Sequence, residues 1–154
     1  MKRDEALHPL SHQHHNALVG CLLIRKGILK NADRSVLKDF TLSLYNDDIQ
    51  HHLRSEEKYI YPHLDRLHLP YKEIITREHE TIRVLAERIR VHENGYLDLA
   101  TFADFLESHI RFEERVVFNR LQESLDEQGR NSLQQDIAGI NARKCSDYPV
   151  KFWE

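Results

Sequence analysis

The apolar positions of this chain recur every three or four residues over long stretches, which is the period of an amphipathic α-helix. The clearest example steps alternately by four and three residues through Ile75, His79, Ile82, Ala86 and Ile89. Such a seam is typical of a helix that buries one face, here with a single imidazole in it. Glycine and proline are sparse, with 5 and 4 residues respectively, so few positions can end a helix. The pattern predicts an all-α protein built from a few long helices.

Start and stop signals divide the chain into four long helices and a shorter fifth. We expect Ser11 to cap the first helix and Thr101 to open the fourth, with Asp104 three residues on. Pro70 limits the second helix, and Asn94-Gly95 is a typical exit for the third. The expected helices run from Pro9 and Ser11 through Ile28, from about Ser35 to His68, from about Tyr71 to Glu93, from about Thr101 to Asp126, and from Ser132 to Ala142.

Short connections between these helices make consecutive helices antiparallel neighbours, so the predicted architecture is an up-down-up-down four-helix bundle. The 154 residues fit a single domain, residues 1–154. Within it we expect a bundle core at about 9–128 and a C-terminal extension at 129–154 that carries the short helix. The tail 148–153 is too aromatic to be a free solvated end, and we expect it to dock on the bundle.

Two segments repeat each other: His52-Leu53-Arg54-Ser55-Glu56-Glu57-Lys58 and His109-Ile110-Arg111-Phe112-Glu113-Glu114-Arg115. Each places a His four residues before a Glu, which on a helix puts imidazole and carboxylate on one face, one turn apart. Both glutamates lie on apolar seams, Glu56 in the second expected helix and Glu113 in the fourth, where the seam runs from Phe105 to Val116. An unpaired carboxylate at such a position is strongly disfavoured. A metal ion supplies positive charge and fixed geometry together. The repeat therefore predicts a pair of metal ions between paired helices.

Lone histidines complete the pattern on the other two helices. His79 lies on the seam of the third helix, and the first helix must supply the matching imidazole from His14 or His15. Both of these lead into apolar rows, so the seam leaves the choice open. The two halves are offset by 57 residues for the His-x-x-x-Glu elements, as the step from His52 to His109 shows. The candidate metal ligands are His14 or His15, His52, Glu56, His79, His109 and Glu113.

Several polar side chains near this set fall off the seams. Glu57 and Glu114, the second acid of each pair, are expected to be solvated charges, and Arg54 and Arg111 are expected at the surface. His63 lies two turns beyond Glu56 on nearly the same face, which makes it a candidate for a supporting or entrance role.

Composition narrows the classes of function. A net charge of -3 offers no basic field for nucleic acid or an anionic membrane, so neither is an expected partner. No stretch approaches the roughly 20 apolar residues of a membrane span, and residues 1–5 lack the apolar region of a signal peptide, so we expect a cytoplasmic protein. Cys21 and Cys145 lie at opposite ends of the chain and are expected to be unrelated thiols.

The motifs resemble those of hemerythrin-like HHE cation-binding domains over residues 8–126. The matching pieces are Gln13-His14-His15, His52-x-x-x-Glu56-Glu57 running into Tyr61-Pro62, Glu78-His79, and His109-x-x-x-Glu113-Glu114. The resemblance implies a four-helix bundle around a non-haem centre of two iron ions, bridged by two carboxylates and an oxo or hydroxo group. It also favours His14 over His15, and it implies handling of dioxygen, nitric oxide or iron.

One departure from the oxygen-carrying hemerythrins matters, since those proteins have two histidines one turn apart in the third helix. Here Ile75 and Arg83 stand one turn from His79, and neither is an expected iron ligand. With four His and two Glu, about two coordination positions stay open on two octahedral irons, against about one in the carriers. More open positions favour redox chemistry, iron exchange or weak ligands over reversible oxygen storage.

The leading hypothesis is a di-iron protein that binds or senses a small gas, dioxygen or nitric oxide, or handles iron. The alternatives are a di-iron enzyme with peroxidase-like or oxidase-like activity, an iron storage or delivery protein, and a site that holds zinc or another divalent metal. No nucleophile triad or phosphate-binding glycine loop is visible, so binding is favoured over catalysis. The sequence predicts no oligomeric state.

Overall fold

The computed structural model describes residues 1–93 and 95–154, and every regular element in this part of the chain is a helix, which confirms the all-α class. Short 3₁₀ turns span Glu5–Leu7 and Cys145–Asp147, and π-helical turns span Tyr45–Ile49 and Glu113–Val117. The α-helices are α1 (His8–Leu29), α2 (Arg34–Leu44), α3 (Gln50–Tyr59), α4 (Tyr61–Arg66), α5 (Lys72–Val91), α6 (Tyr96–Phe112), α7 (Phe118–Ser124) and α8 (Glu127–Ile137).

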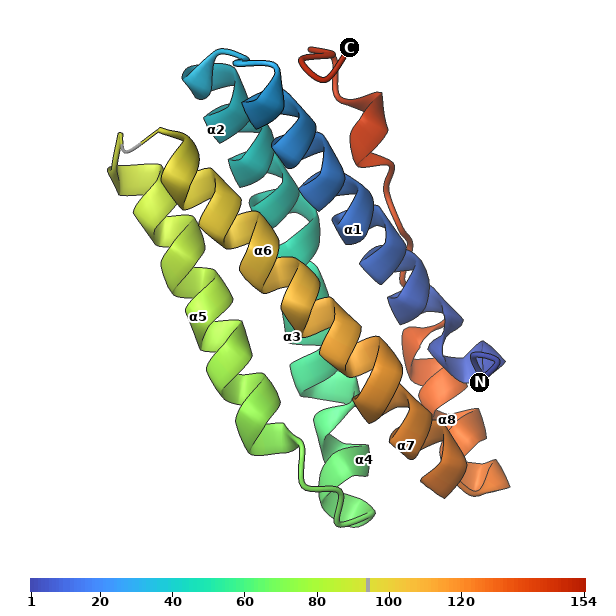
Figure 1. Cartoon of the computed structure of the whole chain (residues 1–154). Coiled ribbons are helices and arrows are strands. Elements are labelled where there is room, and N and C mark those ends of the chain that lie inside the picture. The colour runs from blue at the N-terminus through green and yellow to red at the C-terminus, as the bar shows by residue number, and fades with distance from the viewer. Residues whose placement is uncertain (94) are drawn as a thin grey trace.

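Four helical arms lie side by side (Figure 1): α1, then α2 continued by α3 and α4, then α5, then α6 continued by α7. Among these, α6 packs most extensively against α1 and next against α5. The π turns join α2 to α3 and α6 to α7. A π turn inserts a residue into a helix and rotates the side chains that follow, which is frequent at functional sites. In this chain one π turn precedes His52 and the other begins at Glu113.

The second π turn explains one difference from the expected seam. Val116, which the regular period places in the core, is 36% exposed, whereas Val117 is completely buried. The extra residue of the turn Glu113–Val117 shifts the buried position by one. A helical pattern with a constant period cannot predict this one-residue shift.

Helix ends also differ from the expected ones. Ser11 was expected as an N-cap but lies inside α1, because Asp4 accepts a hydrogen bond from the Ala6 amide and starts the turn that leads into the helix. Thr101 lies inside α6, where its hydroxyl donates to the Leu97 carbonyl. The fifth helix begins at Glu127 rather than Ser132, where the Asp126 side chain accepts from the amide of Gly129.

Proline and left-handed backbone account for the remaining breaks. The expected second helix is interrupted after α3, because Pro62 at the start of α4 has no amide hydrogen to continue the ladder. His68 ends that arm with a φ of 55°. The expected exit at Asn94-Gly95 falls partly on Asn94, which lies outside the described residues; Gly95 has a φ of 68° just before α6.

The buried side chains form two apolar clusters. The first contains residues of α1, α2, α3, α5 and α6 such as Ile24, Phe40 and Phe102. The second contains residues of α1, α4, α5, α7 and α8 such as Leu10 and Leu121. On each arm the two clusters are separated by buried polar residues, which lie between Leu10 and Ala17, Leu53 and Ile60, Ile75 and Ile82, and Leu106 and Val117. The fold thus encloses a polar layer between two apolar ones.

The C-terminal segment runs beside α1 (Figure 1). Its rings surround Phe40, with centroids 5.1 Å away for Tyr148, 5.0 Å for Phe152 and 6.2 Å for Trp153. The Lys30 ammonium donates to the backbone carbonyl of Glu154 at 2.7 Å. Among the described residues, no helix is both long and apolar enough to cross a membrane.

Candidate metal centre

Six side chains from the four arms fill the polar layer. α1 contributes one imidazole, α3 an imidazole and a carboxylate, α5 one imidazole, and the α6–α7 arm an imidazole and a carboxylate. None is more than 5% exposed. The six are His14, His52, Glu56, His79, His109 and Glu113.

The first group of ligand atoms gathers around the α1 histidine. His14 Nε2 lies 3.3 Å from Glu56 Oε1 and 3.0 Å from Glu113 Oε2. His52 Nε2 lies 2.9 Å from the same Glu56 Oε1. These four residues each offer one atom within 4.8 Å of the others.

The second group uses the other two imidazoles with the same two carboxylates. His79 Nε2 lies 3.2 Å from Glu56 Oε2 and 3.7 Å from Glu113 Oε1. His109 Nε2 lies 3.2 Å from Glu113 Oε1. These four residues also offer atoms within 4.8 Å of one another. Both glutamates therefore belong to both groups, as bridging carboxylates between two neighbouring cations would.

Seven buried atoms of the six side chains make no hydrogen bond to any described residue: Nε2 of all four histidines, both carboxylate oxygens of Glu56, and Oε2 of Glu113. A buried polar atom without a partner costs about 1–3 kcal/mol, and native proteins contain few of them. Here the imidazole nitrogens face the carboxylate oxygens at 2.9–3.7 Å, and between neutral imidazoles and carboxylates no hydrogen is present to form a hydrogen bond. Imidazole nitrogen and carboxylate oxygen together are a donor set for a divalent transition metal, so the residues fit a pair of such ions.

The other ring nitrogen of each histidine donates to an oxygen outside the centre. Because carboxylate and amide oxygens only accept, the proton is assigned to Nδ1, and Nε2 of the neutral ring keeps its lone pair for a metal. The four pairs are His14 Nδ1 with Glu114 Oε1 at 2.7 Å, His52 Nδ1 with Gln13 Oε1 at 2.8 Å, His79 Nδ1 with Glu57 Oε2 at 3.1 Å, and His109 Nδ1 with Glu78 Oε1 at 3.0 Å.

Comparison with protein families agrees with this arrangement. The family model described as the hemerythrin HHE cation-binding domain matches residues 6–121. The chain belongs to this family. All six clustered side chains lie within the matched range, whereas α8 and the C-terminal segment follow it. Searches of curated proteins and of solved structures found no match.

The sequence interpretation of this hemerythrin HHE domain was wrong for Glu57 and Glu114. Both were expected to be solvated charges, but each accepts from a buried imidazole. Glu57 also accepts from Arg83 at 2.7 and 3.0 Å, and Glu114 from Arg3 at 2.9 Å. The signal that could have found them is the repetition of the second acid in both copies of the motif.

The remaining residues singled out in the sequence lie elsewhere. His15 is exposed and belongs to neither group of ligand atoms, so the structure brings His14 to the centre. Arg54 and Arg111 are exposed, as expected. His63 is buried away from both groups, and its Nδ1 accepts from the Arg66 guanidinium at 2.9 Å.

The electrostatics of the centre reflect its mixture of charges. Burial lowers the pKa of His14, but the neighbouring carboxylates of Glu113, Glu114 and Glu56 raise it well above its ordinary value. The same opposition raises the pKa of His79 to about 10. Burial raises the pKa of Glu56, and the surrounding histidines lower it well below its ordinary value. The raised pKa values of His14 and His79 favour protonation of these two rings in the metal-free protein, and a bound cation would replace those protons beside the buried carboxylates.

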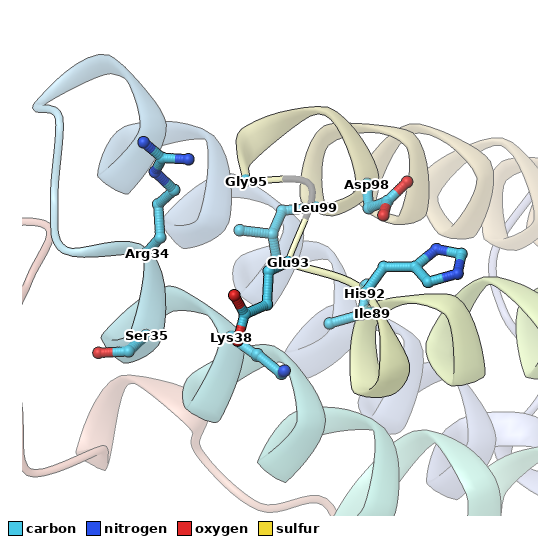
Figure 2. A pocket seen from close by; sticks show the side chains of 9 residues that line it. All are labelled: Arg34, Ser35, Lys38, Ile89, His92, Glu93, Gly95, Asp98 and Leu99. Atoms are coloured by element: carbon cyan, nitrogen blue, oxygen red, sulfur yellow. The ribbon is translucent and has the colours of Figure 1, made fainter.

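The cavity in Figure 2 is separate from the hemerythrin HHE centre. It has a volume of about 320 Å³ and lies where α2 and α6 begin and α5 ends. Its wall contains none of the six clustered side chains. The lining residues are Arg34, Ser35, Lys38, Ile89, His92, Glu93, Gly95, Asp98 and Leu99.

Proposed function

We propose that this hemerythrin HHE domain holds two iron ions, one in each group of ligand atoms, with Glu56 and Glu113 shared between them. The observation that carries the proposal is the set of seven unpartnered buried atoms, all from the six clustered side chains. Zinc or another divalent metal is the alternative occupant, because imidazole and carboxylate ligands do not select iron by affinity alone. In this proposal the whole chain is one domain, with up-down-up-down arms and a docked tail.

The proposed activity is the binding or sensing of dioxygen or nitric oxide, or the handling of iron. Bound iron would supply a redox-active centre with open coordination positions for a diatomic gas. The protein's part is to orient the imidazoles through their Nδ1 bonds and to exclude bulk water with the apolar clusters above and below. Ile75 is completely packed in one cluster and Arg83 is paired with Glu57, so neither position beside His79 adds a ligand.

Access to the centre suits a small ligand. A surface groove of about 620 Å³ is lined by His14 and Glu114 together with Arg3, Arg111 and Arg115. The side chains of the centre beneath it are at most 5% exposed. Because these side chains are almost completely buried, the groove gives a diatomic molecule or a metal ion a shorter way to the centre than it gives a larger organic substrate. This size limit supports a gas or iron over an organic substrate.

Elemental analysis of the purified 154-residue chain, with a visible spectrum of the same sample, tests the proposal. We expect about two irons per chain and absorption from charge transfer to the ferric pair, as the two ligand groups require. Gas titration of the reduced protein should then change that spectrum. Zinc or no metal, persisting after anaerobic reconstitution with iron, would contradict the di-iron assignment.

A further inference from the structure

The two halves of the centre differ in the group that accepts the Nδ1 hydrogen bond of one histidine. Gln13 and Glu78 hold equivalent places, since each directly precedes a histidine of the centre and accepts from the Nδ1 of another one. Gln13 Oε1 lies 2.8 Å from His52 Nδ1, and Glu78 Oε1 lies 3.0 Å from His109 Nδ1. One acceptor is a neutral amide and the other is a carboxylate.

The orientation of the Gln13 amide is fixed by a second bond. Its Nε2 donates to the backbone carbonyl of Asn141 at 3.1 Å, which leaves Oε1 facing the imidazole. A hydrogen bond to an ionised acceptor is roughly twice as strong as one to a neutral acceptor. A carboxylate behind a ligand histidine also makes the ring a stronger donor to metal. His109 is therefore the better metal donor of the two.

The supports of the other two histidines carry the same charge in both halves. His14 and His79 each donate to a carboxylate, and each carboxylate is paired with an arginine: Glu114 with Arg3 at 2.9 Å, and Glu57 with Arg83 at 2.7 Å. The difference that remains is one negative charge behind His109 and none behind His52. The groove described above also opens beside His14, on the side that lacks this charge.

We propose that the two metal positions are inequivalent, with the ion between His79 and His109 held more tightly than the ion between His14 and His52. Gln13 and Glu78 act as positioning residues that set this order. The position beside the groove is the exchangeable one, and the protein has a defined state with one ion. This inference rests on the proposed two-metal centre.

Titration of the metal-free 154-residue chain with zinc, in competition with a chromophoric chelator, measures both binding steps without redox chemistry. We expect two equivalents in two steps separated by about tenfold or more, the size of effect that such supporting groups have. Gln13→Glu should tighten the second step about tenfold and leave the first unchanged. Glu78→Gln should weaken the first step by a similar factor. The control Glu80→Gln, at an exposed position beside His79, should change neither step.

The histidine ring resonances in NMR spectra identify the position that fills first. In the wild type the first equivalent should shift the resonances of His79 and His109, and in the double variant Gln13→Glu/Glu78→Gln those of His14 and His52. Two equivalents that bind without preference, or a Gln13→Glu variant with unchanged affinities, would overturn this inference alone. Fewer than two bound ions would overturn the two-metal centre and this inference with it.

Discussion

The first half of the molecule, α1 to α4, and the second half, α5 to α7, contribute equivalent side chains to the centre, yet each half supports the other. Glu57 of the first half accepts from His79 of the second, and Glu114 of the second accepts from His14 of the first. An aromatic ring of each half likewise stacks on the lone histidine of the other half. Neither half alone therefore orients its own lone histidine, and we infer that the repeat works only as a pair.

The differences between the halves lie behind the side chains that face the centre. Phe118 stacks on His14 with centroids 5.3 Å apart, and its equivalent Tyr61 stacks on His79 at 6.2 Å with an added hydroxyl. The arginine that pairs with the supporting carboxylate comes from the N-terminal segment in one half and from α5 in the other. The metal-facing groups are thus duplicated, whereas the groups that tune them have diverged.

Removing a shared carboxylate should abolish the function of both halves together, which is the largest effect we expect. Glu56→Gln should leave fewer than two ions per chain, because Glu56 belongs to both ligand groups. A bound ion present at 100 times its Kd stabilises a protein by about 2.7 kcal/mol. The rise in unfolding temperature on adding metal should therefore be largely lost, as measured by calorimetry with and without zinc.

The matched control is again Glu80→Gln, which makes the same chemical change at an exposed position of α5. Two bound ions and unchanged melting behaviour in Glu56→Gln would show that the carboxylate is not a ligand.

Replacing one supporting carboxylate should affect the halves separately. Glu114→Gln removes the charge behind His14, and Glu57→Gln removes the charge behind His79. Supporting groups of this kind are worth about 10–100-fold in metal affinity. We expect the larger loss for Glu114→Gln, since its bond to the imidazole is 2.7 Å against 3.1 Å for Glu57. Chelator competition measures the metal affinities of both variants. Affinities equal to those of the wild type would show that the two acids act only as surface charges.

The sequence could predict the groups that face the centre because they depend only on the period of one helix. His52 and Glu56 are one turn apart on any α-helix, and burial of both follows from the seam on which they lie. The second acid, Glu57, is rotated by one residue from that seam. Its role depends on which neighbouring helix lies there, and a single helical period does not contain this information.

The same limit explains the errors in helix ends. Thr101 and Asp104 have the spacing of a helix start, yet in the structure Thr101 bonds to Leu97 within α6 and Asp104 pairs with Arg25 of α1 at 2.8 Å. The same two residue types can start a helix or form contacts within and between helices, and tertiary packing determines which of the two occurs. The all-helical class, by contrast, follows from many positions at once and was predicted correctly.

The pH dependence of stability should differ between the metal-free and the metal-bound protein. The pKa of His79 is about 10 in the folded chain, against an ordinary value of 6.5. Its proton therefore stabilises the fold fully below pH 6.5, and this stability is lost as the pH rises towards 10. The pKa of Glu114 is lowered from 4.5 to about 2, because His14 outweighs the effect of burial. Its contribution is present above pH 4.5 and is lost as the pH falls towards 2.

Calorimetry of the metal-free chain should thus give an unfolding temperature that falls between about pH 6.5 and about pH 10. A fall of more than about 4 °C corresponds to about 1–2 kcal/mol in a domain of this size. The zinc-bound protein should lack this fall, because its imidazoles are already neutral. A metal-free protein with constant stability over this range would show that the imidazoles are neutral there too.

The smallest effect is expected from the hydroxyl that distinguishes Tyr61 from Phe118. This hydroxyl is hydrogen-bonded to that of Thr76 at 3.0 Å, and Thr76 also donates to the Lys72 carbonyl. Tyr61→Phe should lower the free energy of unfolding by at most about 1 kcal/mol, since Thr76 keeps its other partner. Both zinc affinities should stay within about twofold of the wild type, because the stacking on His79 remains. A larger loss confined to the His79 position would mean that the hydroxyl, and not only the ring, takes part in tuning the second half.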